Sequence, residues 1–173
     1  MKRPSLLQAV EQLLTEMIRE GLHYFLPPEQ LKGEARRVAD ALGMLSLSRG
    51  DRVLDVGMGP GVAALSLREL KGCQVWGIEQ AGRAWMRDSR WQRRMLSQAG
   101  IKVIATDVLH NGLPLADSSF DAVLLMEVIE HLPVYPLQLL QEVRRVLRPG
   151  GVVFVDHSKF CKPLQSGSTA ERS

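Results

Sequence analysis

Apolar residues recur at helical spacing in the first 45 residues of the chain. One such run begins after Pro4 and Ser5, is expected to end near Gly21 and presents Leu6, Val10, Leu13, Leu14, Met17 and Ile18. A second run is expected to begin at Pro28, whose fixed φ suits a first helical turn. Its inner side carries Leu31, Ala35, Val38, Ala39 and Leu42. The pattern therefore predicts two amphipathic helices ahead of any strand.

Beyond residue 50 the pattern changes to short β-branched runs that alternate with longer helical stretches. The runs cover residues 53–56, 75–78, 103–105, 122–126 and 152–155. Such alternation predicts βαβ units, a parallel sheet and helices on both of its faces. We expect an α/β fold, doubly wound and Rossmann-like, with about five mostly parallel strands.

Composition narrows the class of protein. At 173 residues, 45% of them hydrophobic, the chain suits one domain. Cys73 and Cys161 lie far apart and form no C-x-x-C pair, so we expect no disulfide framework and no cysteine zinc site. The N-terminus lacks a secretory apolar core, and no run reaches the ~18 apolar residues of a membrane span. We expect a cytoplasmic location. The net charge of +3 is ordinary for such a domain and does not by itself indicate a nucleic-acid partner.

The segment VLDVGMGPG, residues 53–61, ends its strand with glycine at three alternate positions. Glycine lets the main chain turn with φ above zero and approach a ligand closely. A dinucleotide fingerprint requires G-x-G-x-x-G, and its third glycine position is Val62, which disfavours a nicotinamide cofactor. The loop alone is also compatible with a tight strand-to-helix turn that binds nothing.

Acidic residues follow the next two predicted strands. Glu79 lies 20 residues after Gly59, where a carboxylate can accept both hydroxyls of a ribose. Asp107 can accept from an exocyclic amine, and the Val108 N–H beside it can donate to a ring nitrogen. Each acid can also be a solvated loop residue, so their joint occurrence matters more than either one.

Five segments in order resemble the class I S-adenosylmethionine-dependent methyltransferases, in the superfamily that includes ubiquinone and menaquinone methylases. They are VLDVGMGPG, VWGIE, IATDVLHNGLPLADSSFD, VLLMEVIEHL and LRPGGVVFV, within residues 53–155. The resemblance implies strand order 3-2-1-4-5 and S-adenosylmethionine as cofactor. It implies that the methionine part is held by Asp55, Gly57, Gly59 and Gly61, the ribose by Glu79, and the adenine by Asp107 with Val108. It also implies that Met126 and Glu127 line the methyl-donor side.

Methyl transfer from a sulfonium is an in-line displacement that mainly requires orientation of the acceptor and exclusion of water. We expect a small-molecule or lipid-like acceptor and no metal. A hydroxyl or acidic carbon would gain from a general base. His131 is the first candidate and Glu127 the second; further candidates are Glu130, His157 and His110. A purely structural role for His131 remains an alternative.

The predicted organisation has three parts. Residues 1–45 form helices that cap the cleft, with His23, Tyr24 and Phe25 on the acceptor side; residues 46–157 form the cofactor-binding core; residues 158–173 form a polar tail. The family's final antiparallel strand pair has no counterpart in this sequence. We therefore expect either an open edge at residues 152–157 that pairs with a second copy or another partner, or an incomplete protein. A non-catalytic cofactor-binding or partner-binding module is the corresponding alternative.

Arginines form a stripe on a predicted helix over residues 81–99, namely Arg83, Arg87, Arg90 and Arg94. Such a stripe can contact phosphates, and an RNA or protein methyltransferase would require it to adjoin the cleft. A solvated helix face explains it as well. Without interleaved aromatic residues, the sequence disfavours nucleic acid as a partner.

Overall fold

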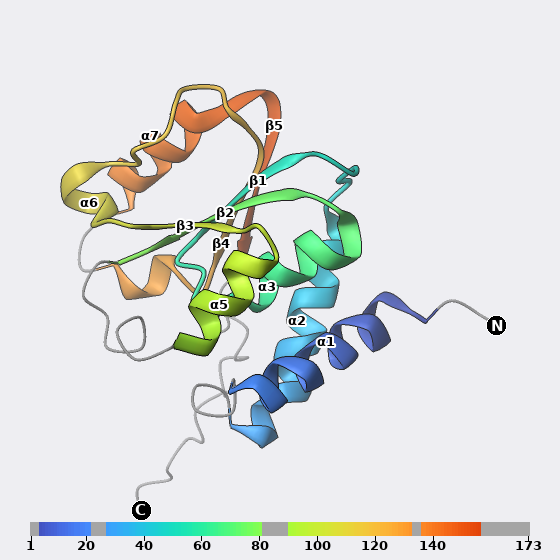
Figure 1. Ribbon diagram of the computed structural model, residues 1–173. Coiled ribbons are helices and arrows are strands. Elements are labelled where there is room, and N and C mark those ends of the chain that lie inside the picture. Colours follow the sequence, from blue (N-terminus) through green and yellow to red (C-terminus); the bar gives the residue numbers. More distant parts are fainter. Residues whose placement is uncertain (1–3, 22–26, 81–89, 133–135, 157–173) are drawn as a thin grey trace, which may run out of the picture.

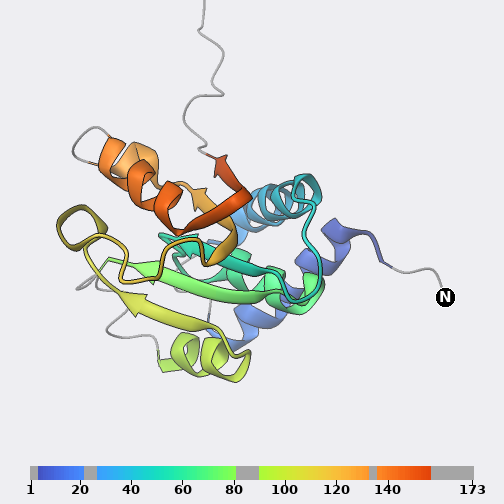
Figure 2. The same ribbon diagram turned by 90° about the horizontal axis from the view of Figure 1, so that it is seen from above.

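The computed structural model describes residues 4–21, 27–80, 90–132 and 136–156, and the description below concerns those residues. Five strands form one sheet: β1 (Arg52–Val56), β2 (Gln74–Glu79), β3 (Lys102–Ala105), β4 (Phe120–Met126) and β5 (Leu147–Asp156). Their order is β3-β2-β1-β4-β5, and every neighbouring pair is parallel. Figure 2 shows β3 at one edge and β5 at the other. The predicted fold class and strand order are confirmed.

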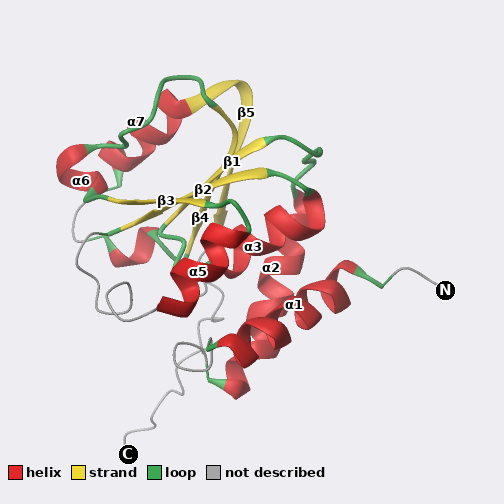
Figure 3. Cartoon of the chain, viewed as in Figure 1, coloured by secondary structure: helices red, strands yellow, loops and turns green. Residues whose placement is uncertain are grey.

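Helices cover both faces of this sheet (Figures 1 and 3). They are α1 (Leu6–Glu20), α2 (Leu31–Met44), α3 (Val62–Ser66), α5 (Arg90–Gln98), α6 (Val108–Asn111) and α7 (Leu137–Val146). Short turns add η2 (Pro28–Gln30), the π-helical η3 (Leu67–Lys71) and η4 (Ile129–His131). In Figure 1, α1, α2, α3 and α5 lie on one side of the sheet, whereas α6 and α7 lie on the other.

Alternate strand residues supply the two halves of the core. Val53, Val75 and Leu124 pack under α1, α2, α3 and α5, whereas Leu54 and Leu125 point to the face under α7. Strands buried on both faces read as nearly continuous apolar runs, which is why the sequence located them well.

The two N-terminal helices form as their patterns predict. Ser5 caps α1 in a reciprocal capping box with Gln8, and Gly21 ends it with φ 131°. The stripe of α1 is buried at Val10, Leu14 and Met17. In α2 every predicted inner residue is buried except Leu31, which is half-buried. Helix α2 lies against the sheet face and α1 packs on α2, so α2 is the nearer of the two to the strand ends.

The largest differences from the predicted boundaries in the described residues are at β5 and α2. Strand β5 begins at Leu147, five residues before the expected position 152, because Leu147 already pairs with Phe120 of β4 ahead of a register shift. Helix α2 begins at Leu31 and not at Pro28, because Pro28–Gln30 form a 3₁₀ turn. At the start of α3, Gly61 serves as the N-cap with φ 90°, a conformation that suits glycine.

Some predictions fall outside the described residues. These are the acceptor-side residues His23, Tyr24 and Phe25, the candidate base His157, Arg83 and Arg87 of the stripe, and the tail 158–173. Of the helix expected over 81–99, only α5 lies within the described part. The helices that the structure describes include none with the length and apolar content that a bilayer span requires.

Candidate functional site

A cleft of about 440 Å³ opens at the carboxyl ends of the strands. This is where parallel α/β sheets bind ligands, because strand order reverses between β1 and β4. The sequence-predicted residues that line it are Asp55, Gly57, Gly59, Glu79, Asp107, Val108, His110, Met126, Glu127 and His131. The tertiary structure thus gathers residues from four strand ends into one site. Gly61 does not line the cleft; a Cβ there would meet Leu96 Cδ2 at 2.9 Å.

Asp55 is the most deeply buried acid of the cleft, with 2% of its surface exposed. Its Oδ2 is buried and has no hydrogen-bond partner among the described residues. Burial, followed by the nearby Glu79 carboxylate, raises the pKa of Asp55 to about 7, although Arg37 acts in the opposite direction. An unpaired buried carboxylate oxygen that faces a cleft is suited to a cationic ligand group.

The glycine loop makes close approaches that a larger residue would prevent. A Cβ on Gly57 would lie 2.7 Å from Val128 Cγ2, and Gly57 has φ 69°. At Gly59, with φ 53°, a Cβ would meet no atom within 4 Å, so only its backbone conformation requires glycine.

The N–H groups of three residues in this loop have acceptors within the protein. The N–H groups of Gly57 and Met58 donate to the Ile78 carbonyl at 2.8 and 3.1 Å. That of Gly59 donates to Glu79 Oε2 at 3.0 Å. The loop therefore offers the cleft a bare, closely approaching main chain, and a carboxylate ligand group must find its donor elsewhere.

Glu79 is held firmly at the end of β2. Besides Gly59, the Gln80 N–H donates to Glu79 Oε1 at 3.0 Å, and the residue is 5% exposed. A carboxylate has about four acceptor positions, so two remain for hydroxyls. Behind the loop, the buried Gln92 side chain from α5 donates to the Gly59 carbonyl at 3.0 Å. The sequence analysis missed Gln92, because a polar residue on an otherwise apolar face carried no distinguishing signal.

Asp107 is the N-cap of α6. Its Oδ1 accepts from the Leu109 and His110 N–H groups at 3.1 and 3.2 Å, and its Oδ2 lies 3.0 Å from His110 Nδ1. The His110 hydrogen bonds lower the pKa of Asp107 below its ordinary value. Among the described residues, the Val108 N–H has no acceptor, as expected of a first helical residue. One anionic acceptor and one free donor thus stand side by side.

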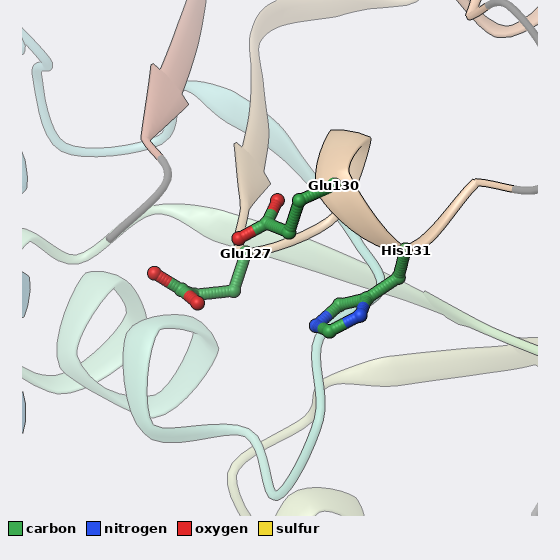
Figure 4. A group of neighbouring side chains, drawn as sticks. All are labelled: Glu127, Glu130 and His131. Atoms are coloured by element: carbon green, nitrogen blue, oxygen red, sulfur yellow. The ribbon is translucent and has the colours of Figure 1, made fainter. Parts of the chain in front are cut away.

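Three further groups follow the end of β4 (Figure 4), and two of them, Glu127 and His131, line the cleft. Glu127 has φ 56°, a left-handed conformation rare for a residue with a side chain, and its N–H donates to the Asp156 carbonyl at 2.8 Å. Glu130 and His131 follow in η4. Glu130 was a minor candidate in the sequence; its two carboxylate oxygens are buried and have no hydrogen-bond partner in the described part of the chain.

Helix α2 contributes Glu34 and Arg37, which the sequence analysis did not select. Arg37 Nε and Nη2 donate to Glu34 Oε2 at 3.1 and 2.6 Å. Its Nη1 lies 3.9 Å from Glu127 and 3.6 Å from Asp156, without a hydrogen bond. Burial acts to lower the pKa of Arg37, but Glu34, Glu127 and Asp156 outweigh it and raise this pKa. A signal existed, since a charged i, i+3 pair borders the buried face of α2.

The described part of the arginine stripe lies away from the cleft. Arg90 and Arg94 are exposed on α5 and are not among the residues that line it. Met95 and Ala99 pack against the core from this region, together with the buried Leu96. For Arg90 and Arg94, the solvated-face interpretation therefore fits.

Comparison with known families and proteins identifies this architecture. A family model described as a methyltransferase domain matches residues 54–155. The chain belongs to this methyltransferase family. The resemblance drawn from the five sequence segments is confirmed, and the cofactor of the family is S-adenosylmethionine.

The chain is similar to curated methyltransferases of several kinds. It is 31% identical over 147 residues to the 27-O-demethylrifamycin SV methyltransferase of Amycolatopsis mediterranei, covering 83% of this chain and 53% of that protein. It is 33% identical over 118 residues to a ubiquinone biosynthesis O-methyltransferase of Chromobacterium violaceum, with 61% and 43% covered. The chain thus spans about half the length of such relatives.

Solved structures agree with the fold. A protein named as a putative sarcosine dimethylglycine methyltransferase from Galdieria sulphuraria superposes with a TM-score of 0.58 and 27% identity, covering 72% of this chain and 48% of that one. The [4+2]-cyclase SpnF gives a TM-score of 0.61 and 26% identity over 72% of this chain and 45% of that one. The same fold therefore occurs in a protein named for a different reaction.

Proposed function

We propose that the chain binds S-adenosylmethionine in the 440 Å³ cleft and transfers its methyl group to a small-molecule or lipid-like acceptor. The observation that carries this proposal is the unpaired, buried Oδ2 of Asp55 in a cleft flanked by two further carboxylates, those of Glu79 and Asp107. The cofactor offers an ammonium, two ribose hydroxyls and an adenine amine. Three acceptors at three strand ends match these three donors.

The assignment of residues follows from their environments. Asp55 receives the ammonium, and Glu79, already oriented by two backbone N–H groups, receives the ribose hydroxyls. Asp107 and the free Val108 N–H face the adenine. Gly57 and Gly59 let the main chain approach the methionine part. These roles extend the family resemblance to individual groups of the cofactor.

Arg37 supplies what the glycine loop does not. The N–H groups of Gly57, Met58 and Gly59 are engaged within the protein, so the carboxylate of the cofactor needs another donor. Arg37 lines the cleft, and its Nη1 is buried. Among the described residues, this nitrogen donates no hydrogen bond. A guanidinium is the strongest available partner for a carboxylate. In this proposal α2 closes the methionine end, which gives the N-terminal region 1–45 its capping role.

Met126, Glu127 and His131 lie on the acceptor side. In-line displacement requires the acceptor atom to lie opposite the sulfur, about 3 Å from the methyl carbon. Carboxylate and imidazole groups can hold a polar acceptor there and take part in removing its proton. The O-methyltransferases among the relatives support a hydroxyl as the acceptor group.

A second candidate is a protein that binds the cofactor without transferring its methyl group. The similarity to SpnF, which is named as a [4+2]-cyclase, supports this candidate, since the fold is not tied to one reaction. The exposed β5 residues Val152, Val153 and Val155 fit a partner or second copy at this edge.

Titration calorimetry with S-adenosylhomocysteine, and with NAD as the control ligand, tests the shared part of both candidates. We expect a Kd of about 1–100 µM for S-adenosylhomocysteine and no binding of NAD. Glu79→Gln should weaken binding by about tenfold or more, because a charge-assisted hydrogen bond contributes about 1.5–3 kcal/mol. Glu69→Gln, an exposed acid outside the cleft, is the matched control.

The two candidates separate in a turnover assay with methyl-labelled cofactor and a panel of small hydroxylated acceptors. Labelled product with any acceptor supports methyl transfer. Cofactor binding without labelled product across the panel favours the non-catalytic candidate. A folded chain that binds no S-adenosylhomocysteine contradicts both.

A further inference from the structure

Two carboxylates and an imidazole converge at the end of β4. Glu127 belongs to the strand end, whereas Glu130 and His131 belong to the next turn, and Figure 4 shows the three side chains extending toward the same space. One ligand atom from each lies within 4.8 Å of the others. Donor atoms bound to one ion at about 2.0–2.2 Å lie roughly 3–4 Å apart. Small side-chain rotations would bring these three atoms to that spacing.

Glu130 is the observation that points to a missing ligand. Both of its carboxylate oxygens are shielded from solvent, yet neither accepts a hydrogen bond from any described residue. Within the same part of the chain, no ion pair includes Glu130. Buried carboxylates are normally hydrogen-bonded, paired or bound to a metal, because burial of an uncompensated charge is costly. His131 forms no ion pair with Glu130 in the described residues, but it is close enough to bind the same cation.

The charge around this group also favours a cation. Glu127, Asp156 and Glu34 surround Arg37, the one cationic group found near them among the described residues. Within the described part of the chain, Arg37 makes hydrogen bonds only to Glu34, and Asp156 Oδ2, which is buried 3.6 Å from Arg37 Nη1, accepts no hydrogen bond. Arg37 is thus shared by Glu34, Glu127 and Asp156, and no Lys, Arg or His of the described residues forms an ion pair with Glu130.

We infer that Glu127, Glu130 and His131 bind one divalent cation at the acceptor end of the cleft. The inference rests on the proposed function for its role in catalysis, but not for the binding itself. Carboxylate oxygens suit Mg²⁺ and Mn²⁺, and an imidazole favours the transition metal of the two. The prediction from sequence that the protein has no metal is replaced by this proposal, because spacing along the chain did not reveal the burial of Glu130.

Such a cation defines the acceptor more narrowly. An octahedral ion with three protein ligands keeps three open positions. A molecule with two neighbouring oxygens, at least one of them a hydroxyl, can occupy two of these positions and orient that hydroxyl toward the methyl group. The substrate class is therefore a chelating diol or hydroxy-carbonyl compound.

The reaction step balances without a further reactant. Coordination lowers the pKa of the acceptor hydroxyl, and its proton passes to solvent. An oxygen lone pair forms the new bond to the methyl carbon while the carbon–sulfur bond breaks. Its electron pair returns to sulfur, which turns the sulfonium into the neutral thioether of S-adenosylhomocysteine. Glu127 and His131 then act as ligands and not as general bases.

A Mn²⁺ titration of the 173-residue chain tests the inference. Binding is measured as the decrease of the paramagnetic resonance signal of the free ion. We expect one Mn²⁺ per chain. Glu130→Gln should weaken binding by at least about tenfold, since removal even of groups that support metal ligands costs about 10–100-fold. Asp40→Asn removes an exposed carboxylate on α2, outside the proposed site, and this variant should bind Mn²⁺ like the wild type. Equal binding by wild type and Glu130→Gln, or no binding by the folded wild type, overturns the inference.

A measurement on the wild-type protein removes the dependence on the folding of a variant. Substoichiometric Mn²⁺ should broaden the imidazole proton signals of His131 before those of His110, with assignment by His131→Gln. Uniform broadening of both overturns the proposed site. Titration with S-adenosylhomocysteine in the absence of metal tests the proposed function separately: cofactor binding without Mn²⁺ binding rejects only the cation, and Mn²⁺ binding without cofactor binding rejects only the methyltransferase assignment.

Discussion

Two glutamate–arginine pairs with the same i, i+3 spacing lie on different faces of the sheet and behave differently. In α7, Arg145 donates from Nε and Nη2 to both oxygens of Glu142 at 2.9 and 2.7 Å. Its remaining donors reach Asp117 Oδ1 at 2.6 Å and the carbonyls of Leu113 and Leu115 at 2.7 and 2.8 Å. Every nitrogen of this guanidinium is used, and the loop before β4 is fixed to α7.

In α2, Arg37 donates only to Glu34, and its third nitrogen has no hydrogen-bond acceptor in the described residues. Asp156 Oδ2 lies 3.6 Å from this nitrogen without a hydrogen bond, and in the same cleft the buried Asp55 Oδ2 accepts none from the described residues. The same residue types form a structural brace in α7, where their hydrogen bonds are complete, and leave polar groups open in α2, where they are not. Under the proposed function, the cofactor completes this second group.

The largest expected effect is on the brace. Arg145→Met should lower the free energy of unfolding by about 2–4 kcal/mol, because it removes the donor of two loop carbonyls and the guanidinium partner of Glu142. Arg144→Met, at an exposed neighbouring position, should change it by less than about 0.5 kcal/mol. Urea unfolding measures both. Equal losses in the two variants would show that Arg145 does not brace the loop.

The brace should also respond to acid in a defined direction. The side-chain hydrogen bond from Arg145, with that from the Leu113 N–H, lowers the pKa of Glu142 to about 2. Its stabilisation is therefore complete above the unfolded pKa of about 4.3 and is lost as the pH falls toward 2. The difference between wild type and Arg145→Met should shrink over that window.

The next effect is at Asp55, where the comparison predicts opposite changes in stability and binding. Asp55→Asn should weaken S-adenosylhomocysteine binding by about 10–100-fold, because an amide oxygen replaces the charged partner of the ammonium. It should also raise the unfolding free energy at pH 8 by about 1–3 kcal/mol, since the wild type must ionise a buried carboxyl. Calorimetry and urea unfolding read the two changes separately, and a loss of both would indicate a structural role instead.

The pH dependence provides the control for this variant. Since the pKa of Asp55 is raised to about 7 by burial and Glu79, the wild type is destabilised as pH rises from about 4 to 7, and the cost is constant above that. A bound ammonium favours the ionised form, so affinity should rise up to about pH 7 with release of a proton. Asp55→Asn should lose this slope.

The smallest of these effects is at Arg37, and it tests the comparison directly. Arg37→Met should weaken S-adenosylhomocysteine binding by about tenfold, through loss of the carboxylate partner, while unfolding free energy changes by about 1 kcal/mol or less. Arg36→Met, on the exposed side of α2, is the matched control. A loss of stability as large as that of Arg145→Met, with affinity unchanged, would make Arg37 a second brace.

Most of the fold was predictable because burial on both faces leaves a strong signal. The strands, the two N-terminal helices and the acids at strand ends followed from apolar runs and from segments in family order. The start of β5 was not predictable, since Leu147–Gly151 contain one arginine, a proline and two glycines, and only the pairing of Leu147 with Phe120 of β4 extends the strand back to this point. Gln92 and Arg37 were missed for a related reason: a polar residue on a helix becomes informative only when its partner is known.

The sequence by itself determined the sheet, its order through the family resemblance, and the positions of Asp55, Glu79 and Asp107 around one cleft, because hydrophobic periodicity and strand-end chemistry are local properties of the chain. Only the tertiary structure decided which charged groups have all their hydrogen bonds satisfied. Glu34–Arg37 and Glu142–Arg145 have the same spacing, and nothing local distinguishes them. Hydrogen-bond satisfaction depends on groups brought from distant segments, and a buried carboxylate such as Glu130 lacks a partner only once the fold has excluded water from it.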